Sequence, residues 1–367
     1  MTTPRHRARD LGVPLEGTSG PLDAITDVAG VCVGFATLVE GSGALQVGRG
    51  PVRTGVTAIL PRGLDSHAPV FAGWFPLNGN GEMTGTAWID ESGFLEGPIL
   101  LTNTHSVGVV RDAVVGWQAR TGRMFQPYSY PIVAETYDGT LNDINGFHVK
   151  PEHALAAIET ATGGRIAEGN VGGGTGMVCF GFKGGTGTAS RRAGDGPSAY
   201  TVGVLVQANF GLRSQLTIAG VPVGRELPMP AAEARIPTTE QGSIIVVVAT
   251  DAPLLPHQLK RLARRAAMGL ARTGSCAGNG SGDIMIAFST ANPDAASLTA
   301  KTRTVEMLSN AQLNPVFDAT VFATEAAILN ALVAAETMTG IDDVTIEALP
   351  HDRVREILAR YGRAAER

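Results

Sequence analysis

The chain has 367 residues, of which 44% are hydrophobic, 17% are charged and 47 are glycine, a composition that excludes a disordered chain and predicts a compact, loop-rich protein. A formal net charge of -5 offers no positive surface to nucleic acid or to an anionic membrane, so small neutral or cationic partners are expected. The cysteines, Cys32, Cys179 and Cys276, have no metal-ligand spacing and form an odd set. Neither a metal site nor a disulfide framework is therefore expected.

The N-terminal residues 1–20 are polar and basic, and they lack the apolar segment of a secretion signal. No apolar run is expected to reach the length that crosses a bilayer. These two observations predict a soluble, cytoplasmic protein without a membrane partner.

Short strands and tight turns are predicted through the first part of the chain. Residues 78–85 contain two Asn-Gly pairs, which are typical of turns. Residues 98–106 read as a strand that ends in a polar cluster, directly before a helix predicted over 107–118. Ligands often bind at such a junction, so His105 in this cluster either contributes to a site or makes structural hydrogen bonds.

Residues 131–139 predict an apolar strand that runs into a carboxylate, an aromatic ring and a turn. Because side chains alternate along a strand, Glu135 and Tyr137 are expected on one face. The pattern fits either a pocket wall or a strand end with a solvated acid. A short amphipathic helix is predicted next, over 151–162.

Residues 168–192 are rich in glycine but do not have the context of a nucleotide-binding loop. A strand follows them, whereas a phosphate loop must open a helix, and the lysine of a Walker motif is missing. These glycines predict close backbone approach or positive-φ turns beside a site. The strand predicted over 200–209 ends at Asn209, whose amide suits either an oxyanion hole or a turn.

The most informative stretch begins at Gly242. Five consecutive β-branched residues, 244–248, predict a fully buried strand. Residues 235–241 before it are polar and contain proline, as an exposed loop does. Ser243 would then stand at the mouth of a core strand, as in an N-terminal-nucleophile hydrolase that cuts its own Gly-Ser peptide bond. The same stretch also fits a plain Gly-Ser turn that enters a strand.

An amphipathic helix is predicted over 256–273. Its expected inward side chains are Leu259, Leu262, Ala266, Met268 and Leu270, and its basic side chains are interpreted as a solvated face. Two further helices are predicted near the end of the chain, a long buried one over 317–337 and a surface one over 352–361.

A glycine-rich segment leads into another predicted strand at 284–290. Ser281 and Asp283 precede it and are two residues apart, so in an extended chain they share a face. This arrangement suits a hydroxyl that is oriented by a carboxylate. A glycine-rich turn with both side chains in solvent fits the spacing equally well.

Three motifs together resemble one family. They are Gly242-Ser243 with the following Ile-Ile-Val-Val-Val-Ala-Thr-Asp-Ala-Pro-Leu, the segment Gly-Asn-Gly-Ser-Gly-Asp that ends at Asp283, and Ala-Glu-Thr-Tyr-Asp around Glu135. From about residue 20 to about residue 339 the chain is similar to the self-processing L-aminopeptidase/D-esterase and β-peptidyl aminopeptidase group. The resemblance implies an α/β/β/α four-layer sandwich of the N-terminal-nucleophile type, without a cofactor. It also implies one catalytic domain, cut into 1–242 and 243–367, and an oligomer of such heterodimers.

The resemblance also implies roles for single residues. Ser243 would supply the attacking hydroxyl and, after cleavage, an α-amino group that acts as the base. An α-amine titrates near pH 8, against about 10.4 for lysine, so much of it accepts a proton at neutral pH. Ser281 and Asp283 would orient or relay protons beside Ser243, although some relatives have glutamate at the last position.

The same resemblance assigns the substrate contacts. Asn209 would donate to the oxyanion, Glu135 would pair with the free amine of the substrate, and Tyr137 would line the pocket. The glycine loop at 172–176 would form the pocket floor. The implied activity is the release of N-terminal residues from small peptides, amides and esters with a free amine, including D-aminoacyl esters.

Two alternatives stand beside this interpretation. The ornithine acetyltransferase group shares the architecture and the self-cleavage but uses threonine as its nucleophile, so Ser243 favours hydrolysis over acetyl transfer. The other alternative is a non-enzymatic binding protein with a glycine-rich small-molecule pocket.

Overall fold

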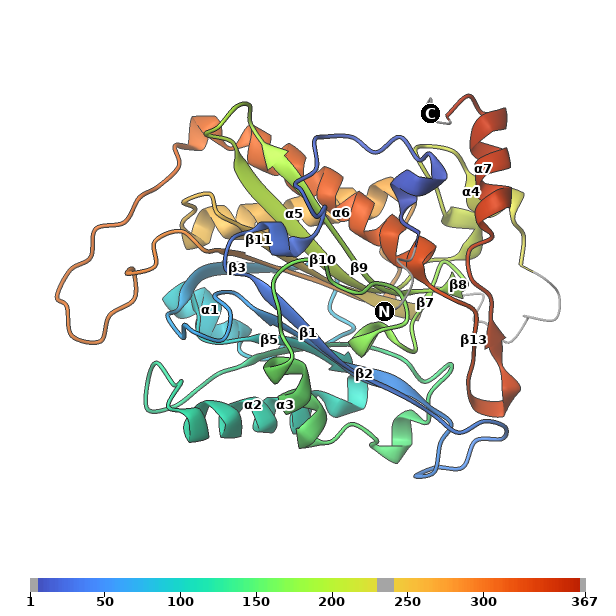
Figure 1. The fold of residues 1–367 in the computed structure, drawn as a ribbon, viewed down its shortest axis with the longest axis horizontal. Helices are drawn as coiled ribbons and strands as arrows, with labels where there is room; N and C mark the ends of the chain where they lie inside the picture. Colours follow the sequence, from blue (N-terminus) through green and yellow to red (C-terminus); the bar gives the residue numbers. More distant parts are fainter. Residues whose placement is uncertain (1–5, 230–240, 364–367) are drawn as a thin grey trace.

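A computed structural model of the protein describes residues 6–229 and 241–363. Two β-sheets stack face to face in it (Figure 1). The first has the order β1-β2-β5-β6, with β1 (Cys32–Glu40), β2 (Val52–Leu60), β5 (Ile99–Asn103) and β6 (Ile132–Thr136). The second has the order β4-β3-β12-β11-β10-β9, with β4 (Phe94–Leu95), β3 (Val70–Pro76), β12 (Gly280–Ser289), β11 (Gln241–Thr250), β10 (Tyr200–Asn209) and β9 (Gly185–Ala193).

Helices cover the outer face of each sheet. On the six-stranded sheet, α5 (Pro256–Arg272) packs on β3 and β12, while α6 (Asn314–Ala334) packs on β9 and β10. On the four-stranded sheet lie α2 (Val107–Thr121) and α3 (Pro151–Glu159). This stack confirms the predicted α/β/β/α sandwich (Figure 1). The smaller elements are α1 (Thr86–Ser92), α4 (Val223–Glu226), α7 (His351–Arg360), β7 (Val178–Cys179), β8 (Phe182–Lys183), β13 (Met338–Thr339) and β14 (Thr345–Ile346).

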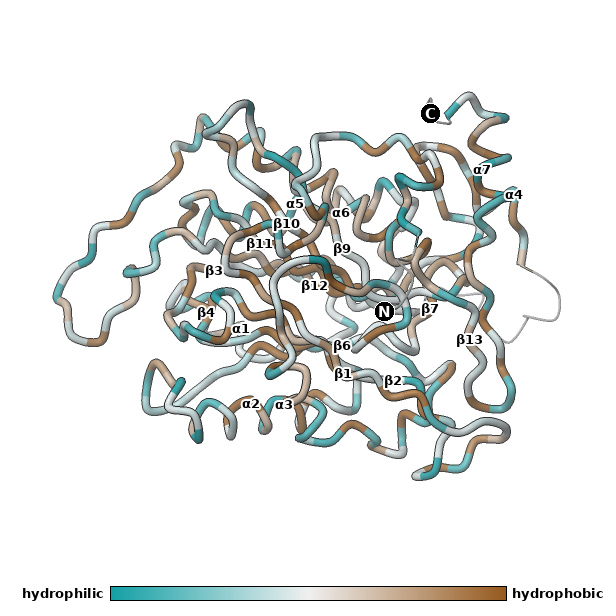
Figure 2. The backbone as a smooth tube through the Cα atoms, in the orientation of Figure 1, coloured by the Kyte–Doolittle hydropathy of each residue, from teal (hydrophilic) through white to brown (hydrophobic). Residues whose placement is uncertain are grey.

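The central strand β11 supplies side chains to two cores at once. Ile245, Val247 and Ala249 enter the layer between the sheets, whereas Ile244, Val246 and Val248 face the helices α5 and α6. All six are fully buried, as the run of β-branched residues predicts. Figure 2 shows the hydrophobic stretches concentrated along the strands in the middle of the molecule.

The start of β11 agrees with the predicted strand to within one residue. The strand begins at Gln241, so the Gly242-Ser243 peptide lies in its first residues, paired with β10 and β12, which excludes a plain Gly-Ser turn. Residues 235–240 of the predicted loop lie outside the described residues.

Helix α5 has the predicted amphipathic character, with one error. Leu259, Leu262, Ala266 and Leu270 are buried, but Met268 is 58% exposed. Position 268 does not lie on the apolar face that the helical repeat defines. Ala263 does lie on that face and is buried, although it was not among the predicted inward residues. The basic face is only partly solvated, because the Arg265 guanidinium lies 4.1 Å from the ring centre of Phe317.

The long buried helix is confirmed as α6, displaced by three residues from the predicted 317–337. It has 21 residues and is long and apolar enough to cross a membrane, so the expectation that no apolar run reaches that length is wrong. The apolar window of this helix is 83% buried inside the protein. In this fold α6 is therefore the core helix of the six-stranded sheet.

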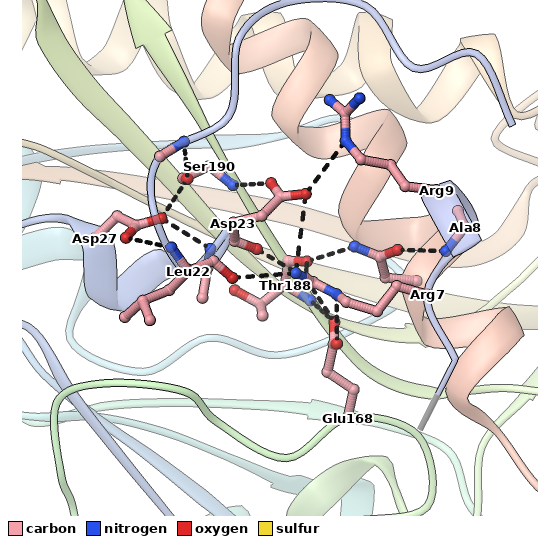
Figure 3. A network of polar contacts seen from close by, with 12 residues as sticks. Arg7, Ala8, Arg9, Leu22, Asp23, Asp27, Glu168, Thr188 and Ser190 are labelled. Carbon is pink, nitrogen blue, oxygen red and sulfur yellow. Dashed lines mark hydrogen bonds and ion pairs between the residues drawn. The ribbon is translucent and has the colours of Figure 1, made fainter. Parts of the chain in front are cut away.

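Segments from elsewhere in the chain cover the outer edge of β9. The backbone N–H groups of alternate residues Thr186, Thr188, Ser190 and Arg192 point outward, and they donate in turn to Gly169 O, Glu168 Oε1, Asp23 Oδ1 and Thr18 O. Figure 3 shows how Arg7 reaches Glu168 and the carbonyl of Thr188 in the same network. An edge strand with its donors satisfied in this way is closed to pairing with another chain.

Candidate active site

A cavity of about 520 Å³ lies at the N-terminal end of β11, where the two sheets meet. Its lining comes from both sheets and from the segments after β3 and β10: Asn80, Gly81, Glu82, Thr104, Glu135, Tyr137, Thr140, Val178, Gly181, Asn209, Phe210, Gly211, Leu212, Gly242, Ser243 and Gly280. Five of the predicted site residues therefore share one cavity. Ser281 and Asp283 do not line it.

Ser243 is 4% exposed and has the same position in the strand alternation as Ile245, so its side chain faces the space between the sheets. Its Oγ donates a hydrogen bond of 2.7 Å to the carbonyl oxygen of Gly242. The hydroxyl therefore lies directly beside the peptide group that the sequence predicts to be cut.

Gly242 is required by packing. A Cβ at this position would lie 2.2 Å from the Asn209 carbonyl oxygen and 2.9 Å from the Cα of Phe210. Only glycine allows β10 to approach the Gly242-Ser243 peptide so closely.

Asn209 lies opposite Ser243 in the β10–β11 ladder, so the two side chains share the cavity face. Its Oδ1 accepts a hydrogen bond of 2.8 Å from the backbone N–H of Val178. The amide is thereby oriented, and its Nδ2 has no hydrogen-bond partner within the described part of the chain. An oriented donor beside a serine hydroxyl has the geometry of an oxyanion site.

Ser281 and Asp283 are in contact, since Ser281 Oγ donates to Asp283 Oδ1 at 2.6 Å. Both are fully buried, which excludes the solvent-facing turn. They alternate with Gly282, the register partner of Ser243, and Ser281 itself is opposite Gly242. Strand alternation therefore places the pair on the other face of the sheet from the Ser243 side chain, next to the Gly242-Ser243 backbone.

Glu135 is buried, which excludes the solvated strand end. Its Oε2 accepts from the Thr104 hydroxyl at 2.5 Å, and its Oε1 accepts from the Glu82 N–H at 3.0 Å. Burial raises the pKa of Glu135, while these two hydrogen bonds oppose the rise. Among the described residues, the cavity lining contains Glu82 and Glu135 but neither lysine nor arginine. A buried carboxylate in such a setting suits a cationic substrate group.

Three further predictions have mixed outcomes. Tyr137 follows β6 and is 49% exposed in the cavity lining. His105 is outside that lining: its backbone N–H donates to Asn103, and its ring stacks on Phe147 with centroids 5.9 Å apart. The glycine loop at 172–176 is not the floor. It fills the space between the sheets, where a Cβ on Gly173 would lie 2.0 Å from the Gln207 side chain.

Sequence reasoning missed the partners of the predicted residues. Thr104 and Glu82 hold Glu135, and Asn78 contacts Asp283. The two Asn-Gly pairs of residues 78–85 were a signal for turns and carried no information about this contact. Within residues 6–229 and 241–363, no group of three or more His, Cys, Asp or Glu side chains could hold a metal ion.

The stacked sheets, with a serine at the start of β11 that faces the cavity, have the architecture of the N-terminal-nucleophile hydrolases. The chain belongs to peptidase family S58, whose profile matches residues 23–346. It is therefore a hydrolase of an aminopeptidase family.

Individual relatives agree with this assignment. The chain is 58% identical to beta-peptidyl aminopeptidase BapA of Sphingosinicella microcystinivorans, over 98% of this chain and 93% of that protein. It is 46% identical to the BapA of Sphingosinicella xenopeptidilytica, over 97% and 92%. The solved structure of L-aminopeptidase D-Ala-esterase/amidase from Ochrobactrum anthropi, described as a variant of the Ntn hydrolase fold, superposes with a TM-score of 0.90 and 49% identity, over 98% of this chain and 99% of that one.

Proposed function

We propose that this chain is an autoprocessing N-terminal-serine aminopeptidase. It cuts itself between Gly242 and Ser243 into residues 1–242 and 243–367 of one catalytic domain, and then releases N-terminal residues from peptides, amides and esters. The observation that carries this proposal is that the Ser243 hydroxyl, the Asn209 amide and the buried Glu135 carboxylate line one cavity.

Processing starts from the contact between the Ser243 hydroxyl and the Gly242 carbonyl. Oγ attacks the carbonyl carbon, the C–N bond breaks, and the acyl group of Gly242 moves to oxygen while the Ser243 nitrogen takes up a proton. Water then hydrolyses the ester. The products are a carboxylate on Gly242 and a free α-amine beside a free hydroxyl on Ser243.

Turnover uses both groups of Ser243. The α-amine accepts the hydroxyl proton as Oγ attacks the substrate carbonyl, and it returns that proton to the leaving amine or alcohol. The Asn209 Nδ2 donates to the oxyanion, a contact typically worth about 3 kcal/mol. The Ser281 hydroxyl donates its hydrogen bond to Asp283, so the lone pairs of Ser281 Oγ remain to accept a hydrogen bond from the protonated amine.

The substrate is held by its own free amine. Glu135 pairs with the ammonium, which makes the enzyme an exopeptidase that rejects N-acylated substrates. Tyr137 borders the first side chain and favours small or medium residues. D-alanyl esters and amides are proposed substrates beside L-aminoacyl peptides, and the BapA relatives add β-aminoacyl peptides to the substrates worth testing.

The remaining proposals concern the molecule as a whole. We infer a cytoplasmic oligomer of processed heterodimers that has neither nucleic acid nor membrane as a partner. Membership of a peptidase family supports hydrolysis over acetyl transfer and over non-enzymatic binding.

Intact-mass measurement and N-terminal sequencing of the purified protein test this proposal. The wild type should give two chains, the smaller beginning at Ser243, and should hydrolyse aminoacyl nitroanilides. Ser243→Ala should stay a single inactive chain, while Ser66→Ala, at an exposed serine outside the cavity, should be cut and active. A wild type that stays in one piece, or a small chain with another first residue, contradicts the proposal.

A further inference from the structure

Asn78 binds Asp283 with both ends of its side-chain amide, one at the backbone and one at the carboxylate. Its Oδ1 accepts a hydrogen bond of 2.6 Å from the Asp283 backbone N–H, and its Nδ2 donates to Asp283 Oδ2 at 3.2 Å. Because an N–H group must meet an acceptor, the amide has one orientation, and this orientation directs Nδ2 at the carboxylate. The other carboxylate oxygen accepts from Ser281. Asn78, Asp283 and Ser281 thus form one hydrogen-bonded chain.

The backbone fixes Asn78 in this place. The N–H of Leu77 donates to the Asp283 carbonyl at 2.9 Å, which continues the β3–β12 ladder up to the neighbour of Asn78. A Cβ on Gly282 would lie 2.4 Å from the Asn80 carbonyl oxygen, so the segment 78–81 is pressed against the start of β12. Asn78 Nδ2 also reaches the Gly278 carbonyl at 3.2 Å.

The same segment continues to the pocket for the substrate amine. Four residues beyond Asn78, the backbone N–H of Glu82 donates to Glu135 Oε1. A Cβ on Gly81 would lie 3.2 Å from both Glu135 Oε1 and the Cα of Gly282. One short stretch of backbone therefore touches the relay on β12 and the carboxylate on β6.

We propose that Asn78 is a positioning residue of the Ser281–Asp283 relay. Donation from Nδ2 favours the ionised form of Asp283, since a hydrogen bond to a charged acceptor stabilises that charge. The ionised carboxylate, which accepts from Nδ2 at one oxygen, accepts the hydrogen bond of the Ser281 hydroxyl at the other. This leaves the lone pairs of Ser281 Oγ to accept a hydrogen bond from the Ser243 amine. The inference rests on the proposed function, in which that amine is the base.

The test compares Asn78→Ala with Asn78→Asp in fully processed enzyme, with kcat and KM for an aminoacyl nitroanilide measured from about pH 5 to about pH 9. Asn78→Ala should lower kcat about 10- to 100-fold, less than the roughly 10²- to 10⁴-fold of a group that itself transfers a proton, with KM within about twofold of the wild type. It should also move the acidic limb of kcat to higher pH, because Asp283 loses a donor to its anion.

Asn78→Asp separates positioning from a merely structural role. At pH 8 the second carboxylate should repel Asp283 and make this variant at least as slow as Asn78→Ala. At the acidic end of the range, where one carboxyl of the pair is protonated, it can donate in place of the amide, so Asn78→Asp should overtake Asn78→Ala. A structural role would change the melting temperature and the active fraction of both variants without this crossover.

A matched control and a mutant cycle complete the experiment. Outside the cavity, the side-chain amide of Asn170 also makes two hydrogen bonds, from its Nδ2 to the Glu336 carbonyl and from the Glu336 N–H to its Oδ1. Asn170→Ala should therefore keep the wild-type kcat and pH profile. Asn78→Ala added to Asp283→Asn should change kcat less than about twofold, since residues that act as a unit are not additive.

The proposed function and the positioning role of Asn78 would be contradicted by different results. If the wild type is uncut or does not hydrolyse the substrate, the proposed function is wrong. If the wild type is cut and active but Asn78→Ala keeps its kcat and acidic limb, or lowers kcat equally in both backgrounds, Asn78 is not a positioning residue.

Discussion

Glu135→Gln isolates the charge that we assign to substrate recognition. The amide keeps the size of the carboxyl group. Its Oε1 can still accept from the Glu82 N–H, and its Nε2 takes the place of Oε2 and faces the Thr104 hydroxyl, which can accept as well as donate. The hydrogen-bonded frame therefore survives the substitution, and only the negative charge is lost.

The size of the effect follows from the contact that disappears. A hydrogen bond to a charged group is worth about 1.5 to 3 kcal/mol, and about 1.4 kcal/mol corresponds to a factor of ten. KM for aminoacyl nitroanilides should therefore rise about 10- to 150-fold, while a gel shows the same processing at Gly242-Ser243 as in the wild type. Glu91→Gln, at an exposed acid on α1, is the control and should leave KM unchanged.

The pH dependence gives the same experiment a second readout. Burial raises the pKa of Glu135, so its anion is lost at a higher pH than that of an ordinary glutamate. In the wild type KM should increase as the pH falls through this raised pKa, and Glu135→Gln should lack that increase. A KM within twofold of the wild type, or equal hydrolysis of N-acetylated and free-amine substrates by the wild type, would refute the role of Glu135.

Three further predictions rest on separate contacts. Gly242→Ala should accumulate uncut chain on a denaturing gel, because its Cβ would collide with β10; normal processing would contradict this account. Ser281→Ala and Asp283→Asn should each lower kcat about 100-fold or more, and the double mutant should lose little beyond the single ones; near-wild-type turnover in either removes it from the relay. Burial raises the pKa of Asp138 to about 7, so the folded protein loses stability as the pH rises from about 4 through 7. Melts at pH 5 and pH 8 should show a smaller decrease for Asp138→Asn than for the wild type, and equal decreases would exclude this role.

The parts of the structure that the sequence predicts well are those with a strict local pattern. Five β-branched residues leave no polar face, so β11 had to be a buried strand. Alternation with period two correctly paired Ser281 with Asp283. Helical periodicity found α5 but, applied loosely, placed Met268 inside. The four-layer order of the elements came from the family resemblance, because no local pattern specifies which sheet faces which.

The contacts that hold the site together could not be predicted from local sequence patterns. Thr104 is 31 residues from Glu135 in sequence, Glu82 is 53 residues from it, and Asn78 is 205 residues from Asp283. Glu82 contributes only its backbone N–H, and Thr104 and Asn78 are of residue types common in many local settings, so none of them indicates its distant partner. Strand pairing brings Asn78 to Asp283 and Thr104 to Glu135, and the stacking of the two sheets brings Glu82 to Glu135.

Strand alternation showed that Ser281 and Asp283 share a face, but it could not show which face Ser243 takes. The register of β11 and β12 supplies the answer, since Ser243 is opposite Gly282 and Ser281 is opposite Gly242. The serine hydroxyl therefore faces the cavity, while Ser281 and Asp283 lie next to the backbone, on the other side of the sheet. In the proposed mechanism this position suits a relay to the Ser243 nitrogen. In the uncut chain this nitrogen is part of a peptide bond and cannot accept a proton, so the proposed relay has a base to orient only after the proposed cleavage.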